Sequence, residues 1–414
     1  MLSLTEVIMV QFRQQDNAHW YHETQRSGSL EIMAAQVSDA SDSVTRKESH
    51  HPHNSESVAE QGLFLLGLDD GIPAALAQNL QHHATVLSAS DALYQVLFPP
   101  IVDLNRNNRF SLYDRLSSAL TVAQVTGVQR LCSHYAARLT PLSSPDASRE
   151  SNMRLTQITQ YARQLASQPT LIDRHALQQL SEVGLSEADI IVLSQIIGFV
   201  GYQARVVAGL SALAGYPTVM LPGFPRMEDA SADLIPATVP QWQGWLPSLA
   251  TLDNIATESP SDETQVALYD LLEHDPQSLS AYKRVTQQQA PQQIPADWLA
   301  LVALVSARIN GSIYCQAHHQ QQLTADSSAG YAPIIDVIVT GVDSALATLP
   351  VHQMAHPLIF LSAELTRAPE RFSHQSIRPL LALGVSHHQL LSLIITAATA
   401  GWTNRLRQTL GATV

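Results

Sequence analysis

Apolar residues recur at spacings of three and four along most of the chain, which is the period of an amphipathic α-helix. This pattern begins after residue 57. Ser111, Ser186 and Ser386 each stand just before such a run, where a serine side chain caps the first turn of a helix. The apolar runs 334–339 and 358–361 fit either a helix or a strand by period alone, and their helical surroundings favour a helix or an extended loop. The sequence therefore predicts an all-α protein.

Two stretches of the chain resemble each other when the sequence is shifted by 200 residues. The matching pairs are Gly184 and Gly384, Ser186 and Ser386, Leu193 and Leu393, Gly201-Tyr202 and Gly401-Trp402, Arg205 and Arg405, and Leu210 and Leu410. Duplication of one helical unit is the simplest explanation. Glycines inside helices predict close helix contacts, and for the two arginines a buried ion pair is favoured over binding of an anionic substrate.

Composition divides the chain into four parts: a disordered polar tail at 1–57, a helical domain at 58–215, a Pro- and Trp-rich connector at 216–260, and a second helical domain at 261–414. The tail is too polar to fold alone. Its histidines His50, His51 and His53 could bind a transition metal, but a solvated tail is favoured because no cysteine or carboxylate completes a site. The connector's prolines forbid regular helix, and its tryptophans predict packing against a domain surface.

The composition of the 414 residues favours a cytoplasmic protein without nucleic-acid or membrane partners. A net charge of −13 opposes binding to phosphate backbones, and no apolar run of membrane-spanning length was expected. Two cysteines imply no disulfide framework, which fits a reducing compartment. A charged fraction of 14% with much apolar helix predicts a homo-oligomer. No pattern indicates a cofactor.

One short stretch concentrates the residues able to do chemistry. Asn310-Gly311 predicts the end of one helix and the start of another. Ser312, Cys315 and His319 then recur at i, i+3 and i+7, on one face of the second helix. A thiol near a helix N-terminus, one turn from an imidazole, favours the reactive thiolate. The stretch therefore predicts a peroxide-reducing or redox cysteine.

Residues 310–319, Asn-Gly-Ser-Ile-Tyr-Cys-Gln-Ala-His-His, resemble the signature helix of the alkylhydroperoxidase D-like and carboxymuconolactone decarboxylase superfamily. The resemblance implies that Cys315 attacks a peroxide and that His319 acts as its base. It also places Ser312 where the family has a resolving cysteine, and Ala300 where the family has a proton-relay glutamate. It implies two such helical bundles in tandem, a decarboxylase-like half followed by an alkylhydroperoxidase-like half.

Two functions remain open at this point. The first is a single-cysteine, peroxidase-related oxidoreductase that takes a small hydroperoxide and is reduced by an external thiol, with Ser312 donating at most a hydrogen bond to the thiolate. The second is a catalytically inactive helical protein of the same fold, used for oligomerisation or ligand binding. The helix Val128–Ala136 is similar to the signature helix when Cys132 is set against Cys315. A lone cysteine there is expected to be a buried packing residue.

Overall fold

The computed structural model describes residues 62–105, 108–219, 226–232, 238–247, 249, 263–287, 294–325 and 330–414. The tail predicted at 1–57, which includes His50, His51 and His53, lies outside these residues. Residues 60 to 414 form one compact unit.

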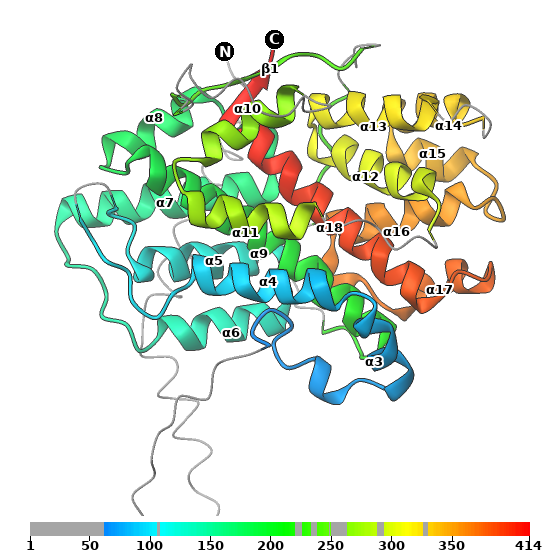
Figure 1. Cartoon of the computed structure of the whole chain (residues 1–414), viewed down its shortest axis with the longest axis horizontal. Coiled ribbons are helices and arrows are strands. Elements are labelled where there is room, and N and C mark those ends of the chain that lie inside the picture. Colours follow the sequence, from blue (N-terminus) through cyan, green and yellow to red (C-terminus); the bar gives the residue numbers. More distant parts are fainter. Residues whose placement is uncertain are drawn as a thin grey trace, which may run out of the picture. The chain divides into compact units, whose positions relative to one another are not determined.

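Sixteen α-helices make up most of the described residues, which confirms the predicted all-α class (Figure 1). Those of the first half are α3 Ala74–Gln81, α4 Ala84–Leu97, α5 Leu112–Thr126, α6 Gln129–Leu139, α7 Arg149–Ser167, α8 Arg174–Glu182 and α9 Glu187–Leu213. Those of the second half are α10 Glu263–Leu272, α11 Pro276–Thr286, α12 Ala296–Asn310, α13 Ile313–Ala325, α14 Ala332–Thr340, α15 Val342–Thr348, α16 Ala355–Arg367, α17 His374–Ala382 and α18 His387–Leu410. Three short 3-10 turns cover Asp69–Gly71, Pro169–Leu171 and Pro369–Arg371.

The two halves follow the same order of elements. Helices α5 and α12 are each 15 residues long and each stops at a glycine in the left-handed region, Gly127 with φ 69° and Gly311 with φ 78°. Helices α6 and α13 start two residues later. Helices α8 and α17, and then α9 and α18, begin 200 residues apart. The second half differs by inserting α14 and α15 before α16.

Local capping sets the start of the longest helices. Ser111, Ser186 and Ser386 each accept a hydrogen bond from the backbone N–H three residues on, and the side chain of that residue bonds back to the serine N–H. These capping boxes satisfy donors that a helix leaves unpaired in its first turn. The predicted helix starts are confirmed, and the ambiguous runs 334–339 and 358–361 are helical, in α14 and α16.

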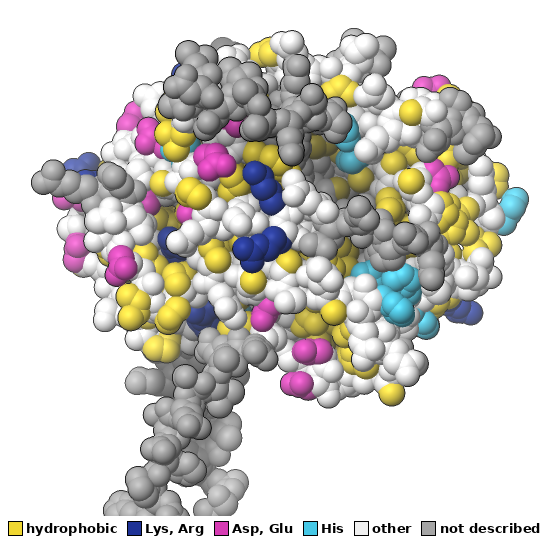
Figure 2. All heavy atoms as spheres, viewed as in Figure 1, with side chains coloured by type: hydrophobic (Ala, Val, Ile, Leu, Met, Phe, Trp, Pro, Cys, Tyr) yellow, Lys and Arg dark blue, Asp and Glu magenta, His cyan; other side chains and the backbone are white. Residues whose placement is uncertain are grey.

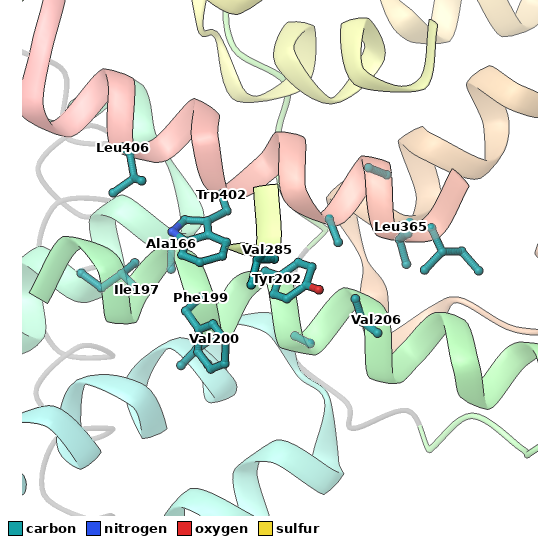
Figure 3. Close-up of a cluster of buried hydrophobic side chains, with 14 of the residues drawn as sticks. Ala166, Ile197, Phe199, Val200, Tyr202, Val206, Val285, Leu365, Trp402 and Leu406 are labelled. Carbon is teal, nitrogen blue, oxygen red and sulfur yellow. The ribbon is translucent and has the colours of Figure 1, made fainter. Parts of the chain in front are cut away.

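The centre of the core is the crossing of α9 and α18. The Trp402 ring on α18 lies 5.6 Å from the Tyr202 ring and 5.8 Å from the Phe199 ring on α9 (Figure 3). A glycine makes this approach possible, because a Cβ at Gly198 would lie 1.9 Å from Trp402 Cδ1. Residues 202 and 402, which match in the sequence at an offset of 200, therefore meet face to face at the junction of the halves.

The two matched arginines link the halves reciprocally. Arg205 on α9 donates to the Thr366 carbonyl at the end of α16 at 2.7 Å, and Arg405 on α18 donates to the Ala166 carbonyl near the end of α7 at 2.8 Å. Each also donates to the carbonyl four residues earlier on its own helix, at 2.8 Å. The prediction that Arg205 and Arg405 form buried ion pairs is therefore wrong: among the described residues, neither guanidinium has an acidic partner within ion-pair distance. Each buried guanidinium satisfies helix carbonyls instead, and the glycines at those carbonyls leave room for it.

The described part of the connector packs against both halves, with Tyr216 bonded to the Gly71 carbonyl of the first and Trp242 buried against the second. Trp242–Gly244 forms strand β1, which pairs antiparallel with β2, Gly411–Thr413, at the end of the chain. The Trp242 indole is buried and donates to the Arg407 carbonyl at 2.9 Å. Buried residues from both halves form one continuous core. The division into separate domains at 58–215 and 261–414 stays a prediction.

Helix α9 corrects one expectation. Within the described residues it is the one helix that is long and apolar enough to cross a membrane, although no such run was expected from the sequence. Its most apolar window is entirely buried inside the protein. Its apolar character is explained by contact with other helices on every side.

The packing at Gly198 predicts the effect of a single added methyl group. Gly198→Ala is expected to lower the free energy of unfolding by about 1–3 kcal/mol, because the methyl must displace the Trp402 ring. Denaturant unfolding followed by tryptophan fluorescence measures the change. Gly341→Ala is the matched control, since its backbone is extended and its nearest neighbour, Ser344 Oγ, is 3.4 Å away. Equal stability of the two variants would contradict the prediction.

Candidate functional site

The chemistry-bearing stretch lies at a sharp helix–helix junction. Helix α12 ends at Asn310, Gly311 turns the chain, and Ser312 occupies the cap position before α13. A side chain at Gly311 would meet Thr170 Cγ2 at 2.5 Å, so the turn also packs closely against the first half. Cys315 is the third residue of α13, where backbone N–H groups lack helical partners and the helix dipole favours negative charge.

A cavity of about 400 Å³ lies beside this helix. Its walls come from α10, α11, α12, α13 and α18 in the second half and from the end of α3 and start of α4 in the first. This volume is within the range of cavities that hold small organic molecules. Histidines gather on the face of the molecule shown in Figure 2, and rings from both halves line the cavity: His82 and His83, and His318 and His319.

Two of the three predicted site residues line the cavity. Cys315 is 4% exposed, so its thiol meets the cavity rather than bulk solvent. His319, one turn further along α13, lines the same wall. Ser312 is buried and does not line it; its backbone N–H bonds to the Ala307 carbonyl and its carbonyl accepts from Gln316 N–H. Cys315 and His319 therefore share α13 as predicted, and Ser312 lies at the position just before that helix.

His319 is held as a neutral ring. Surrounding protein lowers its pKa to about 4, although part of the ring remains accessible to solvent and the bond to Gln322 acts in the opposite direction. Nδ1 donates to Gln322 Oε1 at 2.9 Å, which leaves Nε2 with a lone pair. At neutral pH His319 can accept a hydrogen bond or pass on a proton, but it does not store one.

An arginine and two tyrosines add charge and hydroxyl groups to the wall. The Arg407 guanidinium lies 3.8 Å from the centre of the Tyr314 ring, a cation–π contact. The Tyr282 hydroxyl shares a 2.9 Å hydrogen bond with Thr403. Burial raises the pKa of Tyr282, while Arg407 lowers it and Cys315 raises it, so Tyr282 interacts electrostatically with both groups. Among the lining residues that the structure describes, Arg407 carries the one permanent charge and no aspartate or glutamate is present.

Asn404 is a second polar residue of α18 on this wall. It is fully buried, and neither Oδ1 nor Nδ2 has a hydrogen-bond partner. An unsatisfied buried polar group costs about 1–3 kcal/mol, so this amide destabilises the fold unless a bound group pairs with it. Sequence reasoning missed both Asn404 and Arg407. The sequence did contain a signal for them: these two polar residues lie one turn apart in a helix that is otherwise rich in apolar residues.

At three of the positions that correspond to cavity-lining residues, the first half holds larger side chains. The glycine turns align α6 with α13 at an offset of 184, which sets Leu131 against Cys315 and Tyr135 against His319. On α9, Phe199 takes the place of Thr399. All three of these first-half side chains are fully buried.

The earlier alignment of Cys132 with Cys315 is therefore wrong by one residue. Cys132 does not line the cavity, and burial raises the pKa of its thiol to about 11. It is protonated at neutral pH and is a poor candidate to resolve an oxidised Cys315.

The described residues contain no group of three histidine, cysteine or acidic side chains arranged to hold a metal ion. No protein-family model matches the sequence, and no curated protein matches it. The residues of the cavity therefore carry what can be inferred about function.

The histidines at the cavity rim predict a pH dependence of stability. The pKa of His83 falls from 6.5 to about 4, mainly because of burial, and neighbouring His388 and His82 act in the same direction. Between pH 6.5 and 4 the unfolded chain therefore binds a proton at this position that the folded chain does not, so the free energy of unfolding falls as pH falls through this window.

His83→Gln is expected to reduce that slope. Glutamine does not titrate, and its amide can replace the bond that His83 Nε2 donates to the His388 carbonyl. Urea unfolding at several pH values between 4.5 and 7 measures the slope. His175→Gln, an exposed position on α8, is the control and should leave it unchanged. An unchanged slope for His83→Gln would show that His83 does not contribute.

Proposed function

We propose that the protein is a cysteine-dependent peroxidase that reduces a small organic hydroperoxide in the cavity at α13, with an external thiol as reductant. The observation that carries this proposal is that Cys315 lies in the first turn of a helix, on the wall of a cavity large enough for an organic molecule. A helix N-terminus stabilises a thiolate. The proposal includes membership of the alkylhydroperoxidase D-like and carboxymuconolactone decarboxylase superfamily, with one helical bundle in each half. The repeated order of elements supports a duplicated unit.

The reaction balances with the residues present and two external thiols. The Cys315 sulfur, as thiolate, attacks the terminal oxygen of the hydroperoxide, so that an S–O bond forms as the O–O bond breaks. The leaving alkoxide takes up the proton that the thiol released and departs as an alcohol. One external thiol then displaces water from the sulfenic acid to give a mixed disulfide, and a second thiol releases Cys315 and forms the external disulfide.

Within this proposal His319 relays the thiol proton instead of holding it. A ring with a pKa of about 4 is a weak base toward a thiol, so a stable thiolate–imidazolium pair is not expected. The helix N-terminus and the Arg407 charge supply the stabilisation of the thiolate. An external reductant is needed because Cys132 belongs to α6, away from the cavity.

Mass spectrometry with a sulfenic-acid probe tests the proposal. After treatment with cumene hydroperoxide, the wild-type protein and Cys132→Ser should carry the probe on Cys315. Cys315→Ser should carry none and should consume peroxide no faster than buffer. The expected loss is at least about a hundredfold, since no other thiolate lines the cavity. Equal peroxide consumption by Cys315→Ser and wild type would overturn the proposal.

A non-catalytic ligand-binding protein is the second candidate. It is favoured because two positions lack the catalytic groups that the resembled family has there. Ser312 has no sulfur, and Ala300 on α12 has no carboxylate. The cavity and its unsatisfied amide would then serve binding alone. Titration of Cys315 with iodoacetamide distinguishes the two: an ordinary thiol midpoint, together with no peroxide consumption above buffer, supports this second function.

A further inference from the structure

Asn404 combines two properties that point to a ligand. Its side chain is fully buried on the cavity wall, and both ends of its amide lack a hydrogen-bond partner. Among the described residues that line the cavity, it alone has this combination. Buried polar groups in folded proteins are normally satisfied, so an amide left open toward a cavity indicates that its partner is a bound molecule.

The chemistry of the amide limits that partner. Nδ2 offers hydrogen-bond donors and Oδ1 offers an acceptor, so a satisfying group must both accept and donate. A carboxylate accepts only, and would leave Oδ1 unpaired. A hydroperoxide or hydroxyl group does both, since its oxygen accepts from Nδ2 while its O–H donates to Oδ1.

The rest of the wall indicates the body of this ligand. Apolar side chains surround the polar face, namely Val86, Val285, Ala303, Ile395 and Ala400. The neighbouring Thr403 already bonds to Tyr282, so it does not compete for the same group. A cavity of about 400 Å³ is much larger than hydrogen peroxide needs.

The first half provides an internal comparison. The residue that corresponds to Asn404 at an offset of 200 is Ala204 on α9, and the one that corresponds to Cys315 is Leu131 on α6. Both are buried apolar residues. At these two matched positions the amide and the thiol are therefore found in the second half and apolar side chains in the first. The first half does have a thiol, Cys132, and a buried unpartnered amide, Gln195, but neither lines the cavity.

We infer that Asn404 binds and orients the terminal –OOH group of an organic hydroperoxide with a compact apolar body, and the –OH group of the alcohol product. This role rests on the proposed function for the hydroperoxide, but the alcohol tests it without any reaction at Cys315. Asn404 is an orienting residue here, and bond cleavage belongs to Cys315.

The first experiment measures binding alone. Calorimetric titration of Cys315→Ser protein with 2-phenyl-2-propanol, the alcohol derived from cumene hydroperoxide, is compared with the same titration of Cys315→Ser/Asn404→Leu and of Cys315→Ser/Thr399→Val. Thr399 lines the same cavity, but its hydroxyl already bonds to the Ile395 carbonyl of its own helix. We expect Asn404→Leu to weaken binding roughly tenfold, the effect of one or two hydrogen bonds, and Thr399→Val to leave it nearly unchanged.

The second experiment measures sulfenic acid formation on Cys315 with cumene hydroperoxide. Asn404→Leu should lower the second-order rate by a similar factor, mainly through a higher KM. The thermal midpoint of the ligand-free variant should stay equal or rise, because an unsatisfied amide is removed. A purely structural Asn404 would instead lower that midpoint. Asn404→Ala, which introduces the residue found at 204, provides a second variant if the leucine does not fit.

The outcomes separate the two proposals. Alcohol binding that depends on Asn404, with no sulfenic acid in wild type, keeps this inference and removes the peroxidase function. Sulfenic acid on Cys315 at the same rate in wild type and Asn404→Leu, or alcohol binding of equal strength in the two, overturns the inference and leaves the peroxidase function standing. Failure of the Cys315→Ser parent to bind the alcohol also overturns the inference.

Discussion

The contact on which the rest of the structure depends is the indole of Trp402 seated against Gly198. Two long helices, α9 and α18, can cross this closely because one has no side chain where the other has its largest. The crossing fixes the orientation of α18, and α18 carries Asn404 and Arg407 on its cavity side. A packing constraint at the centre of the core thus determines where the polar groups of the cavity lie.

The difference between the halves follows from side-chain volume at equivalent backbone positions. Phe199 fills space in the first half, and Thr399 leaves space open in the second. The contrast at Val200 and Ala400 goes the same way. Because protein interiors are close-packed, removing this volume leaves a cavity unless neighbours collapse into it. At these matched positions, one order of helices therefore supports filled space in the first half and part of a ligand-sized cavity in the second.

Local features of the fold could be predicted from the sequence, and distant contacts could not. The capping serines Ser186 and Ser386 depend on residues within one turn, so a short stretch of sequence contains the whole signal. The junction of α12 and α13 was predictable for the same reason. The exchange of Arg205 and Arg405 was not, since each carbonyl partner lies more than 150 residues away. The shared cysteine misled the alignment of α6 by one residue, where the left-handed glycines give the correct register.

The cavity has a further consequence because its walls are contributed by both ends of the chain. His83 from the first half lines the same space as groups of α13 and α18 from the second, and it bonds directly to the His388 carbonyl of α18. A molecule that binds there contacts residues of both halves. Because it binds only when the two halves are packed together, its binding free energy stabilises that packing. A bound ligand would therefore stabilise the contact between the halves. It would protect α3 and the start of α4 from local opening and amide hydrogen exchange, although these helices carry no reacting group.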